Sequence, residues 1–150
     1  MRRALAARRP HAGGGARRGA AALTVVVLLA TGCGAPSADL FEVVRSGADR
    51  NANVRILVSD DGTVRCNKGK PVPMGAERLL TARQLARDLE KQAALGLELP
   101  KGRGAILSYS ARLEAGTISF SDQSRGRPGS FNRLVAFTSD VAGNVCKLRR

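Results

Sequence analysis

The sequence predicts an α+β domain in which two helices pack on one face of an antiparallel or mixed sheet. Short segments with alternating apolar residues, typical of strands, come before each of two longer segments with helical periodicity. Residues that favour turns separate them, as in Asp60-Asp61-Gly62. The expected order is β-β-β-α-β-β-α, beginning near Leu40.

Three strands are expected in the first half of this domain. Residues 40–45 are rich in residues that favour β-structure. In residues 54–58, three apolar residues alternate with other side chains, which predicts one strongly apolar face. After the turn, residues 63–67 are expected to return as a strand with Val64 and Cys66 on the same face.

A capping box predicts that the first helix begins at Thr81. In this motif the Thr81 side chain accepts a hydrogen bond from the Gln84 backbone, and the Gln84 side chain reaches back. Leu80 and Leu85 have the spacing of a hydrophobic staple. Gly96 is the expected terminator of this helix.

A second hairpin and a closing helix complete the domain. Residues 105–113 alternate as in a strand with one wetter face, and Ala115-Gly116 predicts a tight turn into residues 117–121. Ser130 is the expected cap of the last helix. Its predicted buried stripe comprises Leu134, Phe137, Val141, Val145 and Leu148.

The first 32 residues have the layout of a bacterial signal peptide. An apolar segment, residues 20–30, is too short to span a bilayer as a mature helix. It follows six arginines and no acidic residue: Arg2, Arg3, Arg8, Arg9, Arg17 and Arg18.

Residues 28–33, Leu-Leu-Ala-Thr-Gly-Cys, resemble a bacterial lipobox. Cys33 would then carry lipid as the first residue of the mature protein, on the outer face of the cytoplasmic membrane. This predicts a signal peptide over residues 1–32, a lipidated tether over 33–39 and a single domain over 40–150. The alternatives are an ordinary secretory signal cleaved near Ala35 or an uncleaved anchor.

Removal of the leader changes the charge balance of the chain. The chain keeps 19 of 25 basic residues and all 12 acidic ones, so the net charge falls from +13 to about +7. An exported basic domain meets anionic headgroups and acidic wall polymers before nucleic acid. We therefore expect an envelope protein or acidic polymer as partner and no nucleic acid, while solubility alone is the simpler explanation of the charge.

With Cys33 acylated, Cys66 and Cys146 form an even pair in an oxidising compartment, which favours one disulfide. Two free buried thiols or a redox-active pair are the alternatives. The bridge would close a loop of roughly 80 residues, and the chain-entropy model gives such a loop about 4 to 5 kcal/mol.

The mature chain carries few of the residues that catalysis or metal binding needs. His11 is the only histidine and lies in the leader, so histidine-based catalytic and zinc sites are excluded. We expect no catalytic residue, no metal and no small-molecule cofactor. An enzyme that uses carboxylates alone, such as a glycan-cleaving pair, is the remaining catalytic alternative.

Two pairs of basic residues flank the second hairpin. Because a hairpin places the start of its first strand beside the end of its second, Lys101 and Arg103 should meet Arg125 and Arg127 at its open end. The four residues form a candidate anion-binding patch, unless they are scattered and separately solvated.

As a whole, the chain resembles small actinobacterial lipoproteins of unknown function, through its Ala/Arg/Gly-rich leader and its lipobox. It also resembles emfourin-type inhibitors of thermolysin-like metallopeptidases, through residues 41–47 (Phe-Glu-Val-Val-Arg-Ser-Gly), the hairpin from Tyr109 to Phe120 and the closing helix. The first resemblance implies location. The second implies peptidase inhibition as an alternative to a general binding role, and no inhibitory residue is transferred.

Overall fold

The structure is a computed structural model that describes residues 38–48 and 52–148. The chain divides into two units, residues 1–33 and residues 34–150, and every described element belongs to the second. The buried core of this unit runs from Phe41 to Ala142, so residues 34–150 carry a complete hydrophobic core of their own.

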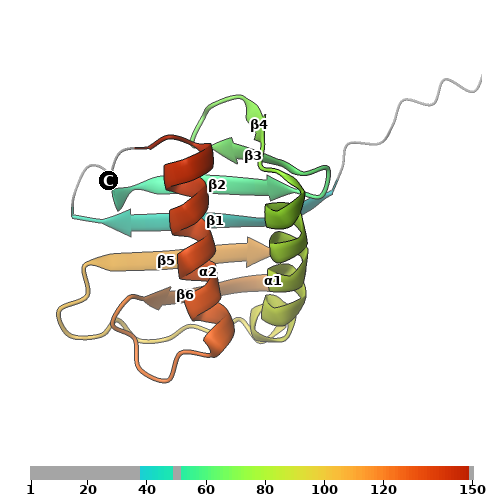
Figure 1. Ribbon diagram of the computed structural model, residues 1–150. Helices are drawn as coiled ribbons and strands as arrows, with labels where there is room; N and C mark the ends of the chain where they lie inside the picture. Colours follow the sequence, from blue (N-terminus) through green and yellow to red (C-terminus); the bar gives the residue numbers. More distant parts are fainter. Residues whose placement is uncertain (1–37, 49–51, 149–150) are drawn as a thin grey trace, which may run out of the picture. The chain divides into compact units, whose positions relative to one another are not determined.

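One antiparallel sheet forms the scaffold of the unit (Figure 1). Its order is β4-β3-β2-β1-β5-β6, and each neighbouring pair is antiparallel. The predicted α+β class is therefore confirmed, with the sheet antiparallel rather than mixed. The strands are β1 (Asp39–Gly47), β2 (Val54–Ser59), β3 (Thr63–Cys66), β4 (Pro71–Pro73), β5 (Leu107–Leu113) and β6 (Gly116–Ser121).

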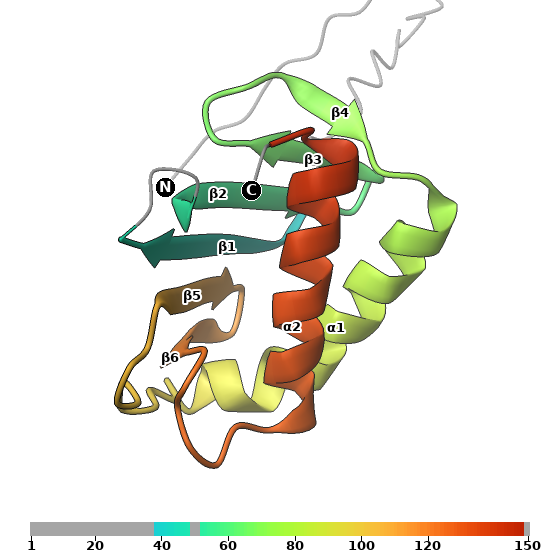
Figure 2. The ribbon, with the colours of Figure 1, turned by 60° about the vertical axis from the view of Figure 1, so that its left-hand side comes forward.

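Both helices cover the same face of the sheet, as predicted (Figure 2). These are α1 (Ala76–Ala94) and α2 (Gly129–Asp140), and α2 continues into a π-helical turn, η2 (Val141–Val145). They run in opposite directions, since Arg78 at the start of α1 pairs with Asp140 at the end of α2 (Nε–Oδ2 2.6 Å). Hydrogen bonds from Arg78 and then Asn144 hold the pKa of the Asp140 carboxyl below its ordinary value.

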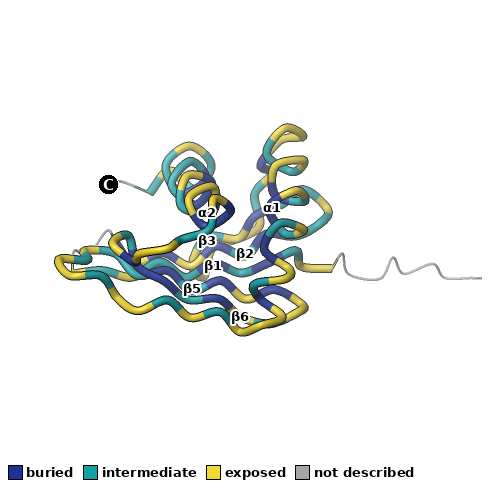
Figure 3. The backbone as a smooth tube through the Cα atoms, turned by 90° about the horizontal axis from the view of Figure 1, so that it is seen from below, coloured by how far each residue is buried: buried dark blue, intermediate teal, exposed yellow. Residues whose placement is uncertain are grey.

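The core lies between the helices and the sheet, where the buried residues gather in Figure 3. Alternation places every second strand residue on this side, and Val43, Ile56 and Ala111 are fully buried there. Phe120 stacks between Tyr109 and Phe131, with ring centroids 5.2 and 4.6 Å away. This stack joins the second hairpin to α2.

The two ends of the sheet differ in what they carry. The proximal end, where β1 begins, holds the β2–β3 and β5–β6 turns and is crossed by α1. The distal end, on the left in Figure 1, holds the described ends of the β1–β2 connection (residues 48 and 52–53), the β3–β4 loop, the segments before β5 and after β6, and residues 146–148. The described chain starts at the proximal end, with Ala38 and the first residues of β1.

The predicted start of the first helix is wrong. The helix begins at Ala76, and the Thr81 hydroxyl lies inside it and donates to the Glu77 carbonyl (3.0 Å). Leu80 is 65% exposed, so the hydrophobic staple does not form either. Residues 76–80 are good helix formers without a break, and the chain turns into them at Gly75, with φ +87°, so nothing delays the helix until the capping motif.

The second helix also begins differently from the prediction. Pro128 precedes its first residue, and Ser130 is its second residue, with a buried hydroxyl that has no hydrogen-bond partner among the described residues. Pro128 occupies the N-cap position, two residues before the predicted cap, and its carbonyl accepts from the Phe131 backbone (3.0 Å). The regular α-helix ends at Asp140, which leaves Leu148 beyond it.

Smaller deviations concern turns and an edge strand. Leu113 pairs with Gly116, so the two-residue turn is Glu114-Ala115, one residue earlier than predicted. Residues 71–73, which lie outside every predicted strand and helix, form the edge strand β4. Proline is tolerated there because an edge strand leaves one side of its backbone without a partner. Gly62, with φ +86°, and Gly96, with φ +58°, take the turn and terminator positions predicted for them.

Candidate binding surfaces

Cys33, the predicted lipidation residue, lies outside the described residues, as does most of the predicted tether. The described chain starts at Ala38, whose carbonyl accepts a hydrogen bond from the Asp60 backbone (2.9 Å) at the proximal end. Among the described residues, no helix has both the length and the apolar character that crossing a membrane requires.

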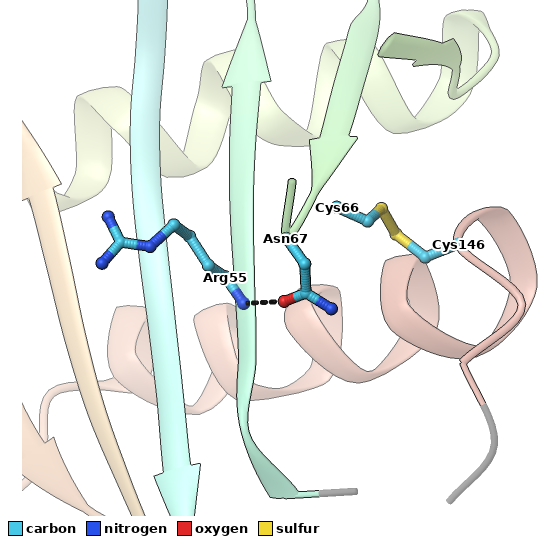
Figure 4. Close-up of a disulfide and its surroundings, with 4 residues drawn as sticks. All are labelled: Arg55, Cys66, Asn67 and Cys146. Carbon is cyan, nitrogen blue, oxygen red and sulfur yellow. Dashed lines mark hydrogen bonds between the residues drawn. A yellow bond between two sulfur atoms is a disulfide. The ribbon is translucent and has the colours of Figure 1, made fainter. Parts of the chain in front are cut away.

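Cys66 and Cys146 lie at disulfide distance, with their Cα atoms 6.0 Å apart. Figure 4 shows the bond between the end of β3 and the turn after η2. The β2–β3 register places Cys66 opposite Ile56, on the side of the sheet that the helices cover. The predicted pairing is therefore sterically satisfied, and it ties the C-terminal segment to the distal end.

This pairing also brings together basic residues that the sequence analysis left separate. Lys68 and Lys70 follow Cys66 in the β3–β4 loop, and Lys147 follows Cys146 directly. The Asn67 carboxamide fixes this loop, since its Oδ1 accepts from the Arg55 backbone (3.0 Å, Figure 4). We call Lys68, Lys70 and Lys147 the disulfide corner. The sequence could have predicted this grouping, because the expected disulfide between Cys66 and Cys146 brings the residues next to each cysteine together.

The two loops of the predicted anion patch are in contact, as the hairpin geometry predicted. The Ser124 hydroxyl donates to the Pro100 carbonyl (2.7 Å), and the Gly102 backbone donates to the Ser121 hydroxyl (3.1 Å). A Cβ on Gly102 would clash with the Gln123 carbonyl, which shows how closely the two backbones approach. The loops that carry Lys101 and Arg103, and Arg125 and Arg127, are therefore one structural unit.

The four patch residues do not have equal roles. Arg127 is half-buried, and its Nη1 donates to the carbonyls of Ser121 (3.0 Å) and Asp122 (2.6 Å), so it holds the loop together. Lys101, Arg103 and Arg125 are exposed, and none of them takes part in a salt bridge within the described part of the chain. We call these three the hairpin corner.

A groove of about 650 Å³ lies at the proximal end, between α1 and the start of β1. Four carboxylates line it, from Asp39, Asp60, Glu90 and Glu114. One of these carboxylates, Asp60, forms a salt bridge with Arg83 (Nε–Oδ1 2.6 Å). This groove is one place where the carboxylate-only alternative could act.

The face of the sheet away from the helices is polar around a central ion cluster. Glu42 lies between two arginines, with Oε1 2.7 Å from Arg55 Nη1 and Oε2 3.1 Å from Arg112 Nη2. Only 13% of its side chain is exposed, whereas the two guanidinium groups are largely in solvent. Glu42 offsets only one of the two positive charges, and the exposed Arg65, in register with Leu57 and Glu42, adds another, so this face carries a net positive charge.

The residues that carry the peptidase-inhibitor resemblance are structural in this fold. Phe41 and Tyr109 are buried in the core, and the Arg45 Nε donates to the Ala52 carbonyl (2.9 Å). Burial is the main cause that raises the pKa of the Tyr109 phenol. No group of three or more metal-ligating side chains occurs within residues 38–48 and 52–148.

Comparison of the chain with protein families, with curated proteins and with solved structures gave no match.

Proposed function

We propose that this chain is an exported, lipid-anchored binding module on the outer face of the cytoplasmic membrane, and that it catalyses no reaction. The signal-peptide layout and the lipobox ending at Cys33 support export and anchoring. Its partner is an envelope protein or an anionic polymer.

The observation that carries this proposal is the separation of the two ends of the sheet. The chain reaches the unit at the proximal end, while the disulfide corner and the hairpin corner are both distal. An anchored module needs its binding surface away from the point of attachment, and this fold provides that separation.

The cysteine pair supports the proposed location. Disulfides form and persist outside the cytoplasm, and the geometry of Cys66 and Cys146 suits one. Thiol trapping on intact cells, with a maleimide that adds a known mass, would show both thiols protected until a reductant is added.

The anchor is tested by intact-mass analysis of the full chain expressed in a bacterium that processes lipoproteins. We expect a product that begins at Cys33 and carries a diacylglycerol group, and a Cys33→Ser variant that is neither acylated nor processed there. A soluble product that retains residues 1–32, or an unmodified Cys33 thiol, would contradict the proposal.

Hydrolysis by carboxylates alone is a second candidate, supported by the four acids that line the proximal groove. Its test is glycan cleavage by the wild type compared with a Glu90→Gln/Glu114→Gln variant. Cleavage that the double variant loses would favour this candidate over a binding role.

A further inference from the structure

We propose that the distal end of the sheet binds an extended anionic polymer of the cell envelope, and not the headgroups of the membrane that holds the anchor. This inference rests on the proposed function for the location of the chain. The residues involved are six exposed cations: Lys68, Lys70, Lys101, Arg103, Arg125 and Lys147.

The loops at the two ends of the sheet differ strongly in charge, although α1 also brings Arg83 and Arg87 to the proximal groove. In the described distal loops the only acidic residue is Asp122, and its carboxylate accepts from the Ile106 backbone (3.2 and 3.3 Å). The two proximal turns carry Asp60, Asp61 and Glu114 and no basic residue. An anionic partner is therefore attracted to the distal end and repelled from the turns at the proximal end.

The spacing of the two corners favours a polymer over a small anion. The disulfide corner extends from β3 and the hairpin corner from β6, which are four strand intervals apart in the sheet. At about 4.8 Å per interval, the corners are roughly 19 Å apart. This exceeds two Debye lengths at physiological salt, about 16 Å, so a single phosphate feels only one corner. A chain with repeated anionic groups contacts both and gains from the linkage.

Both corners are fixed before any ligand arrives. The disulfide holds the first, and the hydrogen bonds of Ser121, Ser124 and Arg127 hold the second. The backbone that carries the six cations is therefore ordered, which lowers the entropic cost of binding.

The proposed tether limits contact with the membrane beneath. From Cys33 to Asp39 the chain spans six residues, at most about 20 Å when extended. The nine residues of β1 add about 30 Å between the proximal and distal ends. Because the tether is shorter than the strands, the distal end cannot point straight down onto the anchoring membrane, and its cations touch that membrane only when the strands are strongly tilted toward the membrane plane.

The test compares three ligands on the unit of residues 34–150, with its fold checked by cooperative unfolding in urea. The probes are long-chain inorganic polyphosphate, tripolyphosphate, and vesicles of phosphatidylglycerol and phosphatidylcholine. We expect polyphosphate to bind at least about tenfold more tightly, per phosphate, than either of the others, because it alone bridges both corners along one chain. Binding weakens as salt rises.

Two triple variants and a control locate the surface. We expect Lys68→Gln/Lys70→Gln/Lys147→Gln and Lys101→Gln/Arg103→Gln/Arg125→Gln each to weaken polyphosphate binding at least about tenfold. The control removes the same charge elsewhere, with Arg87→Gln/Lys91→Gln/Arg112→Gln, on α1 and on the proximal half of β5. It should change affinity less than about threefold.

Several results would overturn the inference. These are no polyphosphate binding, equal losses in the control and the corner variants, or vesicles bound as tightly as polyphosphate. The soluble unit lacks Cys33, so its binding does not depend on acylation. Polymer binding together with an unmodified Cys33 would overturn the anchor alone, and an acylated Cys33 without polymer binding would overturn the surface alone.

Discussion

Gly116 packs against the backbone carbonyl of Ala93, where the β5–β6 turn meets the last turn of α1. A Cβ on Gly116 would lie far inside van der Waals contact with that oxygen, and the residue also has φ +149°. Glycine alone allows this approach. The contact closes the proximal end of the unit, because it brings the second hairpin against the helix that crosses the strands.

We therefore expect Gly116→Ala to destabilise the unit by about 2 to 4 kcal/mol, through overpacking and backbone strain. The matched control is Gly143→Ala, because a Cβ at this helical position has no neighbour within 4 Å. Urea unfolding would measure both. A Gly116→Ala variant as stable as Gly143→Ala would show that α1 does not pack against this turn.

Ser124 joins the two loops of the hairpin corner. Its buried hydroxyl donates to the Pro100 carbonyl and accepts from the Ser121 backbone (2.8 Å). Ser124→Ala leaves both groups without this partner, so we expect a loss of about 1 to 3 kcal/mol and faster hydrogen exchange at Ser121. The control is Ser119→Ala, because Ser119 lies on the face of the sheet away from the helices. This variant should leave the free energy of unfolding and the hydrogen exchange at Ser121 nearly unchanged.

The disulfide should contribute much of the stability of the unit. It closes a sequence separation of 80 residues, and loss of such a bridge from a small exported domain costs about 2 to 5 kcal/mol. We expect a Cys66→Ser/Cys146→Ser variant to unfold at lower urea concentration and to be insensitive to reductant, whereas reductant destabilises the wild type. Equal stability of wild type and variant would contradict the pairing.

Tyr109 gives a pH-dependent readout of the core. It is the only tyrosine, and the chain has no tryptophan, so phenolate absorbance reports this one residue. Burial raises its pKa in the folded state, so the unfolded state ionises first as pH rises. The contribution of the neutral, buried Tyr109 to the free energy of unfolding is therefore complete below pH about 10, the ordinary pKa of tyrosine, and declines at higher pH. Native protein should therefore ionise at higher pH than protein in urea, and coincident titrations would place Tyr109 in solvent.

Local pattern predicted the strands well, because alternation records which face is buried. Val54, Ile56 and Val58 are buried as expected. Local pattern did not predict the first residue of either helix, because Thr81 and Ser130 both lie inside their helices. A capping motif states only that a helix can begin there, and the preceding residues decide whether it does. For the same reason β4 was missed, since its few residues form a strand only by pairing with β3.

The amino-acid sequence determined the class of fold and the cysteines that lie at disulfide distance, and it predicts the leader, because these depend on residue type and periodicity along the chain. It also predicted that the two loops beside the second hairpin would meet, since a hairpin is a local structure. Only the tertiary structure decided that Lys68 and Lys147, 79 positions apart in the sequence, lie in the same corner. It also decided that the six cations lie at the distal end of the sheet, away from the start of β1. Strand order and helix direction fix those relationships, and both arise from packing a whole core that no single segment encodes.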